Sequence, residues 1–233
     1  MREKIVGILG GLGPESTAEL FLKIIQSTPA EKDYDHLRII IDNNTKIPNP
    51  TRSILNGENG KIMEATKESL SKLENYGVEI IAIPCNTIHF YWDEIKTFTK
   101  IPIINMIQEV ALVIDQEYPH IEKFGLLATT ATIVGRLYEK FIQKEIITPT
   151  DKAQEKVMDA IYGKSGIKSG GKGKDVIKKF IDASECLRNQ GAEMIIVGCT
   201  EISLVLTEDI VSLPLIDALD VLTKSVIREA RQK

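Results

Sequence analysis

Residues 78–87, VEIIAIPCNT, and residues 192–201, AEMIIVGCTE, follow one pattern: an apolar run leads directly into a cysteine and then into polar residues. Apolar runs of this length, bounded by turn-forming residues, are typical of buried strands in a parallel sheet. Parallel strands end at the same edge of a sheet, which is where ligands bind in such folds. Each segment therefore predicts a strand that carries Cys85 or Cys199 to a ligand-binding edge.

Apolar runs and helical-period segments alternate on both sides of these two segments. We expect strands at 5–9, 37–42, 78–84, 101–106, 123–130, 192–200 and 213–218. We expect helices in the segment that begins at Pro14, near 58–75 and over a long region at 132–162. This alternation predicts an α/β fold with mostly parallel sheets and helices on both faces.

The two halves of the chain also match each other weakly. Three pairs occur in the same order, at separations of 118, 114 and 112 residues: Gly7 with Gly125, Cys85 with Cys199, and Pro102 with Pro214. Similar separations suggest a duplication, although generic strands also match by chance. We expect two similar three-layer α/β/α domains related by a pseudo-two-fold axis, one from 1–113 with 211–233 and one from 114–210, with the active site in the cleft between them.

Composition limits the classes of partner. The 233 residues carry a net charge of −4 with no basic stripe, and no apolar run approaches the roughly 20 residues that span a bilayer. Three cysteines without a C-x-x-C motif, and three histidines, make neither a disulfide framework nor a zinc site. We therefore expect a cytoplasmic protein with reduced thiols, a small-molecule partner, and no nucleic acid, membrane or metal.

Two of the cysteines are candidates for catalysis. Cys85 and Cys199 stand at strand-to-helix corners, where backbone N–H groups and the helix dipole favour a thiolate. Either one alone would be read as a small buried hydrophobe, and Cys186, inside a helical pattern, is read in that way. In duplicated halves, however, two equivalent thiols would face each other across a cleft. That geometry suits removal of a proton from one face of a carbon and delivery to the other, which is two-base racemisation.

Four stretches carry a resemblance to a known family: GILGGLGPEST, IPCNTIHF, LLATTAT and IIVGCTEIS. Over essentially its whole length the chain resembles the aspartate/glutamate racemase family, and most of all its aspartate racemase branch. The resemblance implies two similar α/β domains, no pyridoxal phosphate or metal cofactor, and the cysteines of PCNT and GCTE as the acid–base pair. It also implies interconversion of L- and D-aspartate, with glutamate or a broader range as alternatives, and a homodimer.

An amino-acid substrate needs hydrogen-bond donors for its α-carboxylate and, if it is aspartate, a cation for the second carboxylate. The polar turn residues that can serve the first group, where the resemblance also implies substrate contacts, are Asn86, Thr87, Thr129, Thr132 and Thr200. The same residues could simply cap helices. Arg52 and Lys168 are the candidate cations. In the family a basic residue usually stands at the position that Pro50 occupies here, and Arg52 comes two residues later. The Gly-rich segment 163–174 is either a lid or a solvated linker.

Three rival interpretations remain open. The glycines of GILGGLGPES suggest a nucleotide-binding loop, but Pro14 removes a donor there and Glu15 adds negative charge. A two-lobed periplasmic-type binding protein would have the same organisation, but we see no export signal. Relatives with one catalytic cysteine are decarboxylases or other isomerases, whereas this chain has both cysteines. His89 is expected to be a helix-face or core histidine.

Overall fold

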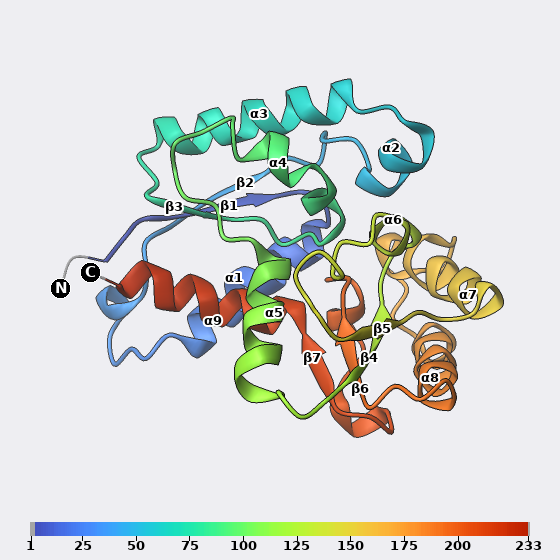
Figure 1. Cartoon of the computed structure of the whole chain (residues 1–233). Coiled ribbons are helices and arrows are strands. Elements are labelled where there is room, and N and C mark those ends of the chain that lie inside the picture. Colours follow the sequence, from blue (N-terminus) through green and yellow to red (C-terminus); the bar gives the residue numbers. More distant parts are fainter. Residues whose placement is uncertain (1–2, 233) are drawn as a thin grey trace.

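The chain contains two parallel sheets, which Figure 1 shows in the computed structural model; it describes residues 3–232. The first sheet has the order β2-β1-β3, with β1 at Val6–Gly10, β2 at Ile39–Asn43 and β3 at Ile80–Ala82. The second has the order β5-β4-β6-β7, with β4 at Lys123–Leu127, β5 at Glu145–Ile147, β6 at Met194–Val197 and β7 at Leu215–Asp217. All strand pairs in both sheets are parallel, as the sequence predicted.

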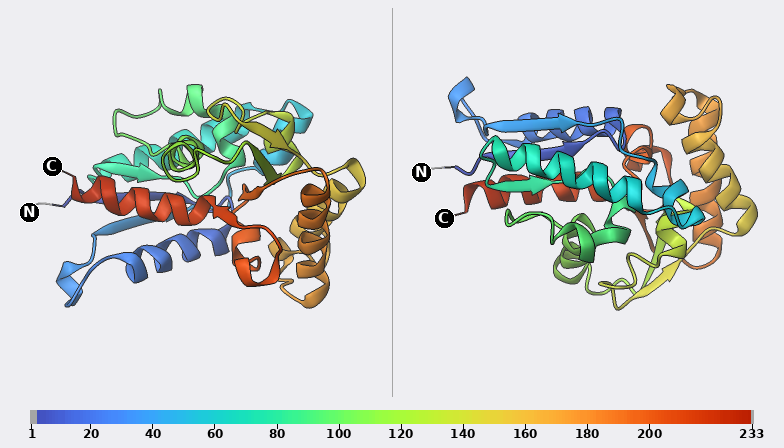
Figure 2. Two further views of the ribbon diagram at one scale, coloured as in Figure 1. Left: turned by 60° about the horizontal axis from the view of Figure 1, so that its bottom comes forward. Right: turned by 90° about the horizontal axis from the view of Figure 1, so that it is seen from above.

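The helices form three layers around these sheets (Figures 1 and 2). The outer face of the first sheet is covered by α3 (Gly60–Asn75), and that of the second by α7 (Asp151–Tyr162) and α8 (Lys174–Asn189). Between the sheets lie α1 (Pro14–Ser27), α5 (Met106–Glu117) and α9 (Ala218–Arg231). Three short helices complete the fold: α2 (Pro50–Asn56), α4 (Trp92–Ile95) and α6 (Thr130–Val134).

The core follows the two-residue period of the strands. In β1, Ile8 faces the central helix layer, whereas Leu9 faces α3. In β4, Leu126 faces the central layer, whereas Leu127 faces α7 and α8. Side chains of both sheets therefore meet one shared central layer. This layer holds the two strand ends that carry the cysteines in a fixed relation.

The internal repeat predicted from the sequence is present in the hydrogen bonding. The Ile81 N–H donates to the Pro102 carbonyl at 2.9 Å, and the Ile195 N–H donates to the Pro214 carbonyl at 2.9 Å. Gly7 and Gly125 occupy equivalent central strands, and a Cβ at either would lie 3.0 Å from a neighbouring side chain. The two halves thus share strand order and tight packing at these two glycines.

Two predicted elements are wrong. The region 132–162 is not one long helix, because residues 145–147 pair with β4 as strand β5 and Pro149 disfavours helix in the residue before it. Residues 101–106 form no strand: only Ile103 makes a bridge, to Ile81, before α5 begins. In both places, the β-branched segment is too short for its pattern to show whether it forms a helix or a strand, or where that element ends.

The C-terminal segment is divided between the two halves. Strand β7 pairs with β6 in the second sheet, whereas α9 packs against α1 and α5. The segment 211–233 thus contributes its strand to the second sheet and its helix to the central layer. The boundaries 1–113 with 211–233, and 114–210, remain a prediction.

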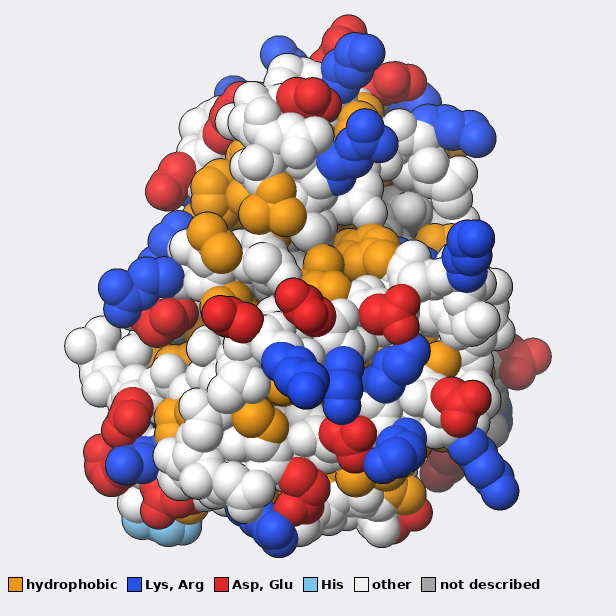
Figure 3. All heavy atoms as spheres, turned by 90° about the vertical axis from the view of Figure 1, so that its right-hand side faces the viewer, with side chains coloured by type: hydrophobic (Ala, Val, Ile, Leu, Met, Phe, Trp, Pro, Cys, Tyr) orange, Lys and Arg blue, Asp and Glu red, His pale blue; other side chains and the backbone are white. Residues whose placement is uncertain are grey.

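The described part of the chain contains no helix that is both long enough and apolar enough to cross a membrane. On the face shown in Figure 3, acidic and basic side chains lie close together, and hydrophobic side chains gather in a hollow between the upper and lower parts of the molecule. On this face a row of acidic side chains lies directly above a row of basic side chains.

Candidate active site

The ends of β3 and β6 bring Cys85 and Cys199 to one small pocket, the inner pocket. It has a volume of about 10 Å³ and is lined from both halves of the chain. Next to Cys199, a Cβ on Gly198 would lie 2.7 Å from a methyl carbon of Leu126, so a larger residue here would force the Leu126 side chain to move. Besides the cysteines, the predicted substrate contacts that line the inner pocket are Asn86, Thr87, Thr129, Lys168 and Thr200.

Asn86 presents an unused donor to this pocket. Its Oδ1 accepts a hydrogen bond from the Tyr138 hydroxyl at 2.7 Å, which fixes the orientation of the amide. Its Nδ2 is buried and has no hydrogen-bond partner among the described residues. A buried amide N–H without a partner is costly. It is a donor that a bound carboxylate could satisfy.

Three threonine hydroxyls form a closed cluster beside Asn86. The Oγ1 atom of Thr87 lies 2.9 Å from that of Thr129 and 3.1 Å from that of Thr132, and the last two are 3.1 Å apart. Thr132 is fully buried behind the other two and does not line the inner pocket. Thr200 joins the halves instead, because its hydroxyl donates to the Pro84 carbonyl at 3.2 Å.

Burial keeps the Cys85 thiol protonated in this closed pocket. Desolvation, followed by the negative charge of Glu201, raises the pKa of Cys85 to about 11. The positive charge of Lys168 and the backbone N–H groups of Thr87 and Ile88 act in the opposite direction. The turn therefore supplies donors for a thiolate, but a further positive charge is needed to form one at neutral pH.

Cys199 has a carboxylate as its partner. Its Sγ lies 3.2 Å from Oε2 of Glu201 and donates a hydrogen bond to it. Burial, and then the charge of Glu201, raise the pKa of Cys199 well above the ordinary value, and Lys168 opposes this. The Cys199 thiol thus has a proton acceptor beside it, whereas the Cys85 sulfur has the backbone N–H groups of Thr87 and Ile88 beside it.

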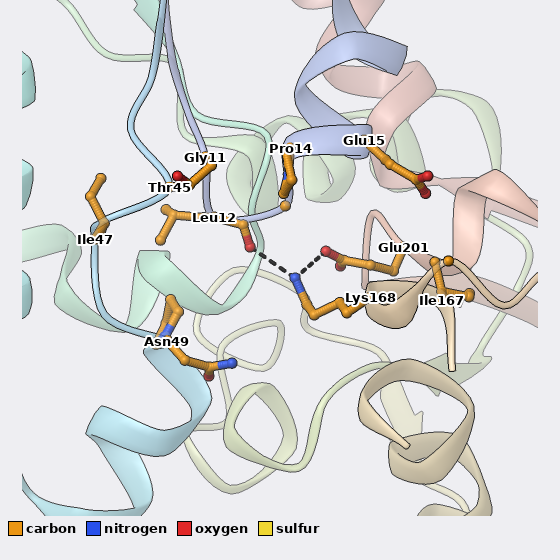
Figure 4. A pocket seen from close by; sticks show the side chains of 13 residues that line it. Gly11, Leu12, Pro14, Glu15, Thr45, Ile47, Asn49, Ile167, Lys168 and Glu201 are labelled. Atoms are coloured by element: carbon orange, nitrogen blue, oxygen red, sulfur yellow. Dashed lines mark hydrogen bonds and ion pairs between the residues drawn. The ribbon is translucent and has the colours of Figure 1, made fainter. Parts of the chain in front are cut away.

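Lys168 and Glu201 line the inner pocket, and Figure 4 shows the contact between them. The ammonium of Lys168 forms an ion pair with Glu201 and donates to the Leu12 carbonyl at 2.9 Å. Burial opposes its charge, but Glu201 raises the pKa of Lys168 above the ordinary value. A side chain at Gly13 would collide with the Glu201 carboxylate, so the loop after β1 needs glycine here.

Sequence reasoning did not assign Glu201 a role. Its position was nevertheless marked by the repeat: 114 residues separate it from Thr87, as they separate the two cysteines. Tyr162 also lines the inner pocket, beside Lys168. Its ring lies 5.6 Å from the Lys168 ammonium, and burial raises the pKa of its phenol to about 12.

A larger cavity, the outer cavity, opens directly outside the inner pocket. Its volume is about 550 Å³. It shares Leu12, Pro50, Lys168 and Glu201 with the inner pocket, so these residues form the wall between them. Figure 4 shows the wall, with the loop after β1 on one side and Lys168 on the other. A molecule reaching the cysteines from the outer cavity must pass this wall.

Arg52 does not take part in either space. Its side chain is exposed on α2, and only its backbone N–H is engaged, donating to Asn49 Oδ1 at 3.1 Å. Neither the inner pocket nor the outer cavity is lined by it. A contact between Arg52 and the substrate stays a prediction. The place of Arg52 two residues beyond Pro50 turns it away from the site.

The glycine-rich segment 163–174 is held by hydrogen bonds of its own. The Gly171 N–H donates to the Gly166 carbonyl at 3.0 Å, and the segment positions Lys168 at the wall. Lys172 forms an ion pair with Glu15, at 3.2 Å, across to the loop after β1. Whether the segment opens as a lid remains a prediction. Its contacts with the opposite half are those that such an opening would break.

His89 lies in the core, as expected, and fixes the first cysteine turn. Its Nδ1 lies 2.8 Å from the Cys85 carbonyl, to which it donates, and its Nε2 accepts from the Met106 N–H at 3.3 Å. Burial lowers the pKa of His89 to about 4. The ring is therefore neutral at physiological pH. It ties the Cys85 turn to the start of α5.

The remaining chemistry-bearing groups lie elsewhere. Cys186 lies in α8, with its Sγ 3.7 Å from the Thr150 hydroxyl, and lines neither space. No group of three or more His, Cys, Asp or Glu residues is placed to hold a metal ion within the described residues 3–232. In the glycine loop, the Gly11 N–H donates to Thr17, whose hydroxyl donates to Gly13. These polar groups already have partners within the chain.

The sequence and the fold match proteins of known kind. The family model described as Asp/Glu/Hydantoin racemase matches residues 9–226. The broad specificity amino-acid racemase RacX of Bacillus subtilis is 29% identical over 233 residues, covering 96% of this chain and 96% of that protein. The aspartate racemase of Picrophilus torridus is 27% identical, with a TM-score of 0.86 over 99% of this chain and 95% of its own. The Francisella tularensis glutamate racemase, solved with D-glutamate, shares the fold at 19% identity, with a TM-score of 0.68 over 97% of this chain and 80% of its own.

Proposed function

The chain belongs to the Asp/Glu/hydantoin racemase family and is an amino-acid racemase, an isomerase, and we propose that it inverts the α-carbon of its substrate by proton transfer between Cys85 and Cys199. One observation carries this proposal: two thiols from equivalent turns, one from each half, line the same pocket. Thiols on two sides of one carbon can remove a proton from one face and return a proton to the other.

In one direction, Cys199 acts as the base. Its proton passes to Glu201, to which it already donates, and the thiolate then takes the α-proton of the substrate. The Cys85 thiol delivers its own proton to the opposite face of the carbon. In the reverse direction, Cys85 is the base and Cys199 is the acid. After one turnover in the first direction, the removed proton lies on Cys199, Cys85 is a thiolate, and Glu201 carries the proton that Cys199 gave up. Exchange with water takes the proton from Glu201 and returns one to Cys85, which resets the site.

The carbanion that forms between the two transfers needs stabilisation on the substrate carboxylate. The buried Nδ2 group of Asn86 is the donor best suited to it, since its Oδ1 is occupied by Tyr138. The hydroxyls of Thr87 and Thr129 line the same pocket and can turn toward the ligand. Donors fixed before the reaction stabilise such developing charge without reorganisation.

Substrate binding requires the wall to open. The inner pocket, at about 10 Å³, holds no amino acid while Lys168 is paired with Glu201. In this proposal, the substrate carboxylate replaces Glu201 as the partner of Lys168. Glu201 is then free to accept the Cys199 proton, and the substrate ammonium adds the positive charge that favours a thiolate.

Aspartate is the first substrate to test, because the Picrophilus torridus relative is named for it; the name of the Bacillus subtilis relative indicates a broader range. With Arg52 outside the site, a side-chain carboxylate would depend on Lys168 alone. A homodimer is a prediction of the sequence resemblance, and a cytoplasmic location is a prediction from the reduced cysteines. Light scattering after size-exclusion chromatography tests the former.

The deciding experiment is proton exchange in deuterated water. The purified protein is incubated with each enantiomer of aspartate, glutamate and other free amino acids, without added cofactor, and the α-proton signal is followed by NMR. We expect deuterium at the α-carbon together with formation of the opposite enantiomer. Failure to label any amino acid would reject the proposal.

A further inference from the structure

The outer cavity is much larger than a short acidic side chain needs. At about 550 Å³ it falls within the range of roughly 300–1,000 Å³ that is usual for sites that enclose drug-sized ligands. It adjoins the inner pocket through the wall of Lys168 and Glu201. An amino acid whose α-carbon lies between the cysteines would extend its side chain past this wall. The outer cavity is therefore the natural place for a side chain of several carbons.

Resting on the function proposed above, we infer that this enzyme acts on amino acids with a long, cationic side chain, of the lysine, ornithine or arginine type. The charges lining the outer cavity favour this class. Glu15 and Glu201 are acidic, and Lys168 is the one cation among the described lining residues. Lys168 is already engaged by Glu201 and the Leu12 carbonyl.

A second carboxylate, in contrast, finds no unengaged partner in this lining. Arg52, the expected partner, is exposed on α2 and lies outside the cavity. If Lys168 takes the α-carboxylate, as proposed, it cannot also serve a carboxylate at the far end of a long side chain. Buried or half-buried charges need an opposite charge, so aspartate and glutamate are poorly matched to this space.

Glu15 is the proposed partner of the substrate's terminal cation. It lies in the first turn of α1, where the positive end of the helix dipole favours a carboxylate. Its present partner is Lys172, in an ion pair in which both side chains are about half exposed. Exposed pairs of this kind are weak. A substrate ammonium or guanidinium could therefore take the place of Lys172.

The rest of the wall suits the methylene groups between the two ends of such a substrate. Apolar side chains of Leu12, Ile47 and Ile167 face the outer cavity together with Pro14 and Pro50. Figure 4 shows Leu12 and Ile47 on the side of the first half and Ile167 on the side of the second. Burial of each methylene against such a surface contributes favourably.

The test compares α-proton exchange for L-lysine, L-norleucine, L-glutamate and L-aspartate. Norleucine keeps the aliphatic chain of lysine without its charge. We expect kcat/KM to be at least about 10-fold higher for lysine than for either acidic substrate. Glu15→Gln should lower the ratio of the lysine value to the norleucine value by about 2- to 5-fold, which is the effect of losing one half-exposed ion pair. Glu15→Asp should partly restore it.

Lys172→Met is the matched control, because it removes the competing partner from the same carboxylate. It should keep or raise kcat/KM for lysine. Exchange with aspartate or glutamate alone, or a lysine-to-norleucine ratio unaffected by Glu15→Gln, would overturn the inference and leave the racemase proposal intact. Absence of exchange with every amino acid would instead overturn both.

Discussion

The two cysteine turns share a backbone and differ in charge. Both follow a parallel strand, and both are tied to the start of a helix in the central layer. The equivalent positions around them, however, hold different side chains: Thr87 with Glu201, His89 with Ser203, and Asn105 with Asp217. The duplicated fold supplies symmetric positions for two thiols, while substitutions after duplication give each thiol its own protonation chemistry.

The hydrogen bonds that join each cysteine turn to the start of α5 or α9 show this difference. In the first half, the neutral ring of His89 joins the Cys85 carbonyl to α5, which Asn105 caps. In the second half, the Ser203 hydroxyl donates to Asp217 at 2.7 Å, and Asp217 caps α9 by accepting from the Leu219 N–H at 2.8 Å. The first turn is held by uncharged groups and the second by an acid. Each of these differences can be tested.

Removing either thiol should have the largest effect. Cys85→Ser and Cys199→Ser each replace an acid–base group with a hydroxyl that does not ionise near neutral pH. We expect racemisation in both directions to fall by about 10³-fold or more, within the roughly 10²- to 10⁴-fold contributed by a positioned acid or base. Circular dichroism of enantiomer interconversion measures this directly. Cys186→Ser is the control, and a similar loss there would contradict the assignment.

Glu201→Gln tests the asymmetry between the turns. The variant loses the acceptor for the Cys199 proton, so racemisation should fall by about 10²-fold. The pKa of both thiols should nevertheless decrease, because the Glu201 charge raises both of them. The pH dependence of iodoacetamide labelling, in a Cys186→Ala background, measures this change. Lys168→Met should move the labelling midpoint to higher pH; movement of both variants in the same direction would reject this account.

Much of the fold was predictable because strand ends and repeats are local patterns. The cysteine turns, Asn86 and the threonines follow buried strands directly, and a parallel sheet brings such residues to one edge. The spacing of the repeat was enough to predict that Cys85 and Cys199 occupy equivalent positions. These features depend on backbone geometry, which the apolar pattern specifies.

Features that depend on contacts distant in sequence were not predictable. The wall joins Leu12 with Lys168 and Glu201, residues far apart in the chain, and nothing local marks their meeting. Arg52 lies outside both spaces, because a shift of two residues on a helix turns a side chain to another face. Strand β5 was missed because a strand of three residues gives too short a pattern to distinguish from helix.

His89→Gln should change how stability depends on pH. The pKa of His89 is lowered to about 4 by burial, below its ordinary value of 6.5, so the unfolded chain binds more protons between these values. Stability of the wild type therefore falls as pH decreases from 6.5 to 4, by about 2–3 kcal/mol from this residue. The variant should lack this loss, as measured by urea unfolding at pH 4.5 and 7. An identical slope for variant and wild type would contradict the neutral, buried ring.

Asp217→Asn should have a smaller effect of the opposite sign, and it makes the second half resemble the first, where Asn105 caps the helix. Burial raises the pKa of Asp217 from 3.8 to about 6, so the folded chain binds more protons between these values. The contribution of Asp217 to the stability of the wild type therefore falls as pH rises from 4 to 6. The variant, which can still cap α9, should gain about 2 kcal/mol relative to the wild type over that range. Urea unfolding at pH 4 and 7 measures the gain. In the His89→Gln, Asp217→Asn double variant, the dependence of stability on pH should be close to that of the wild type, because the two lost contributions have opposite signs and nearly cancel.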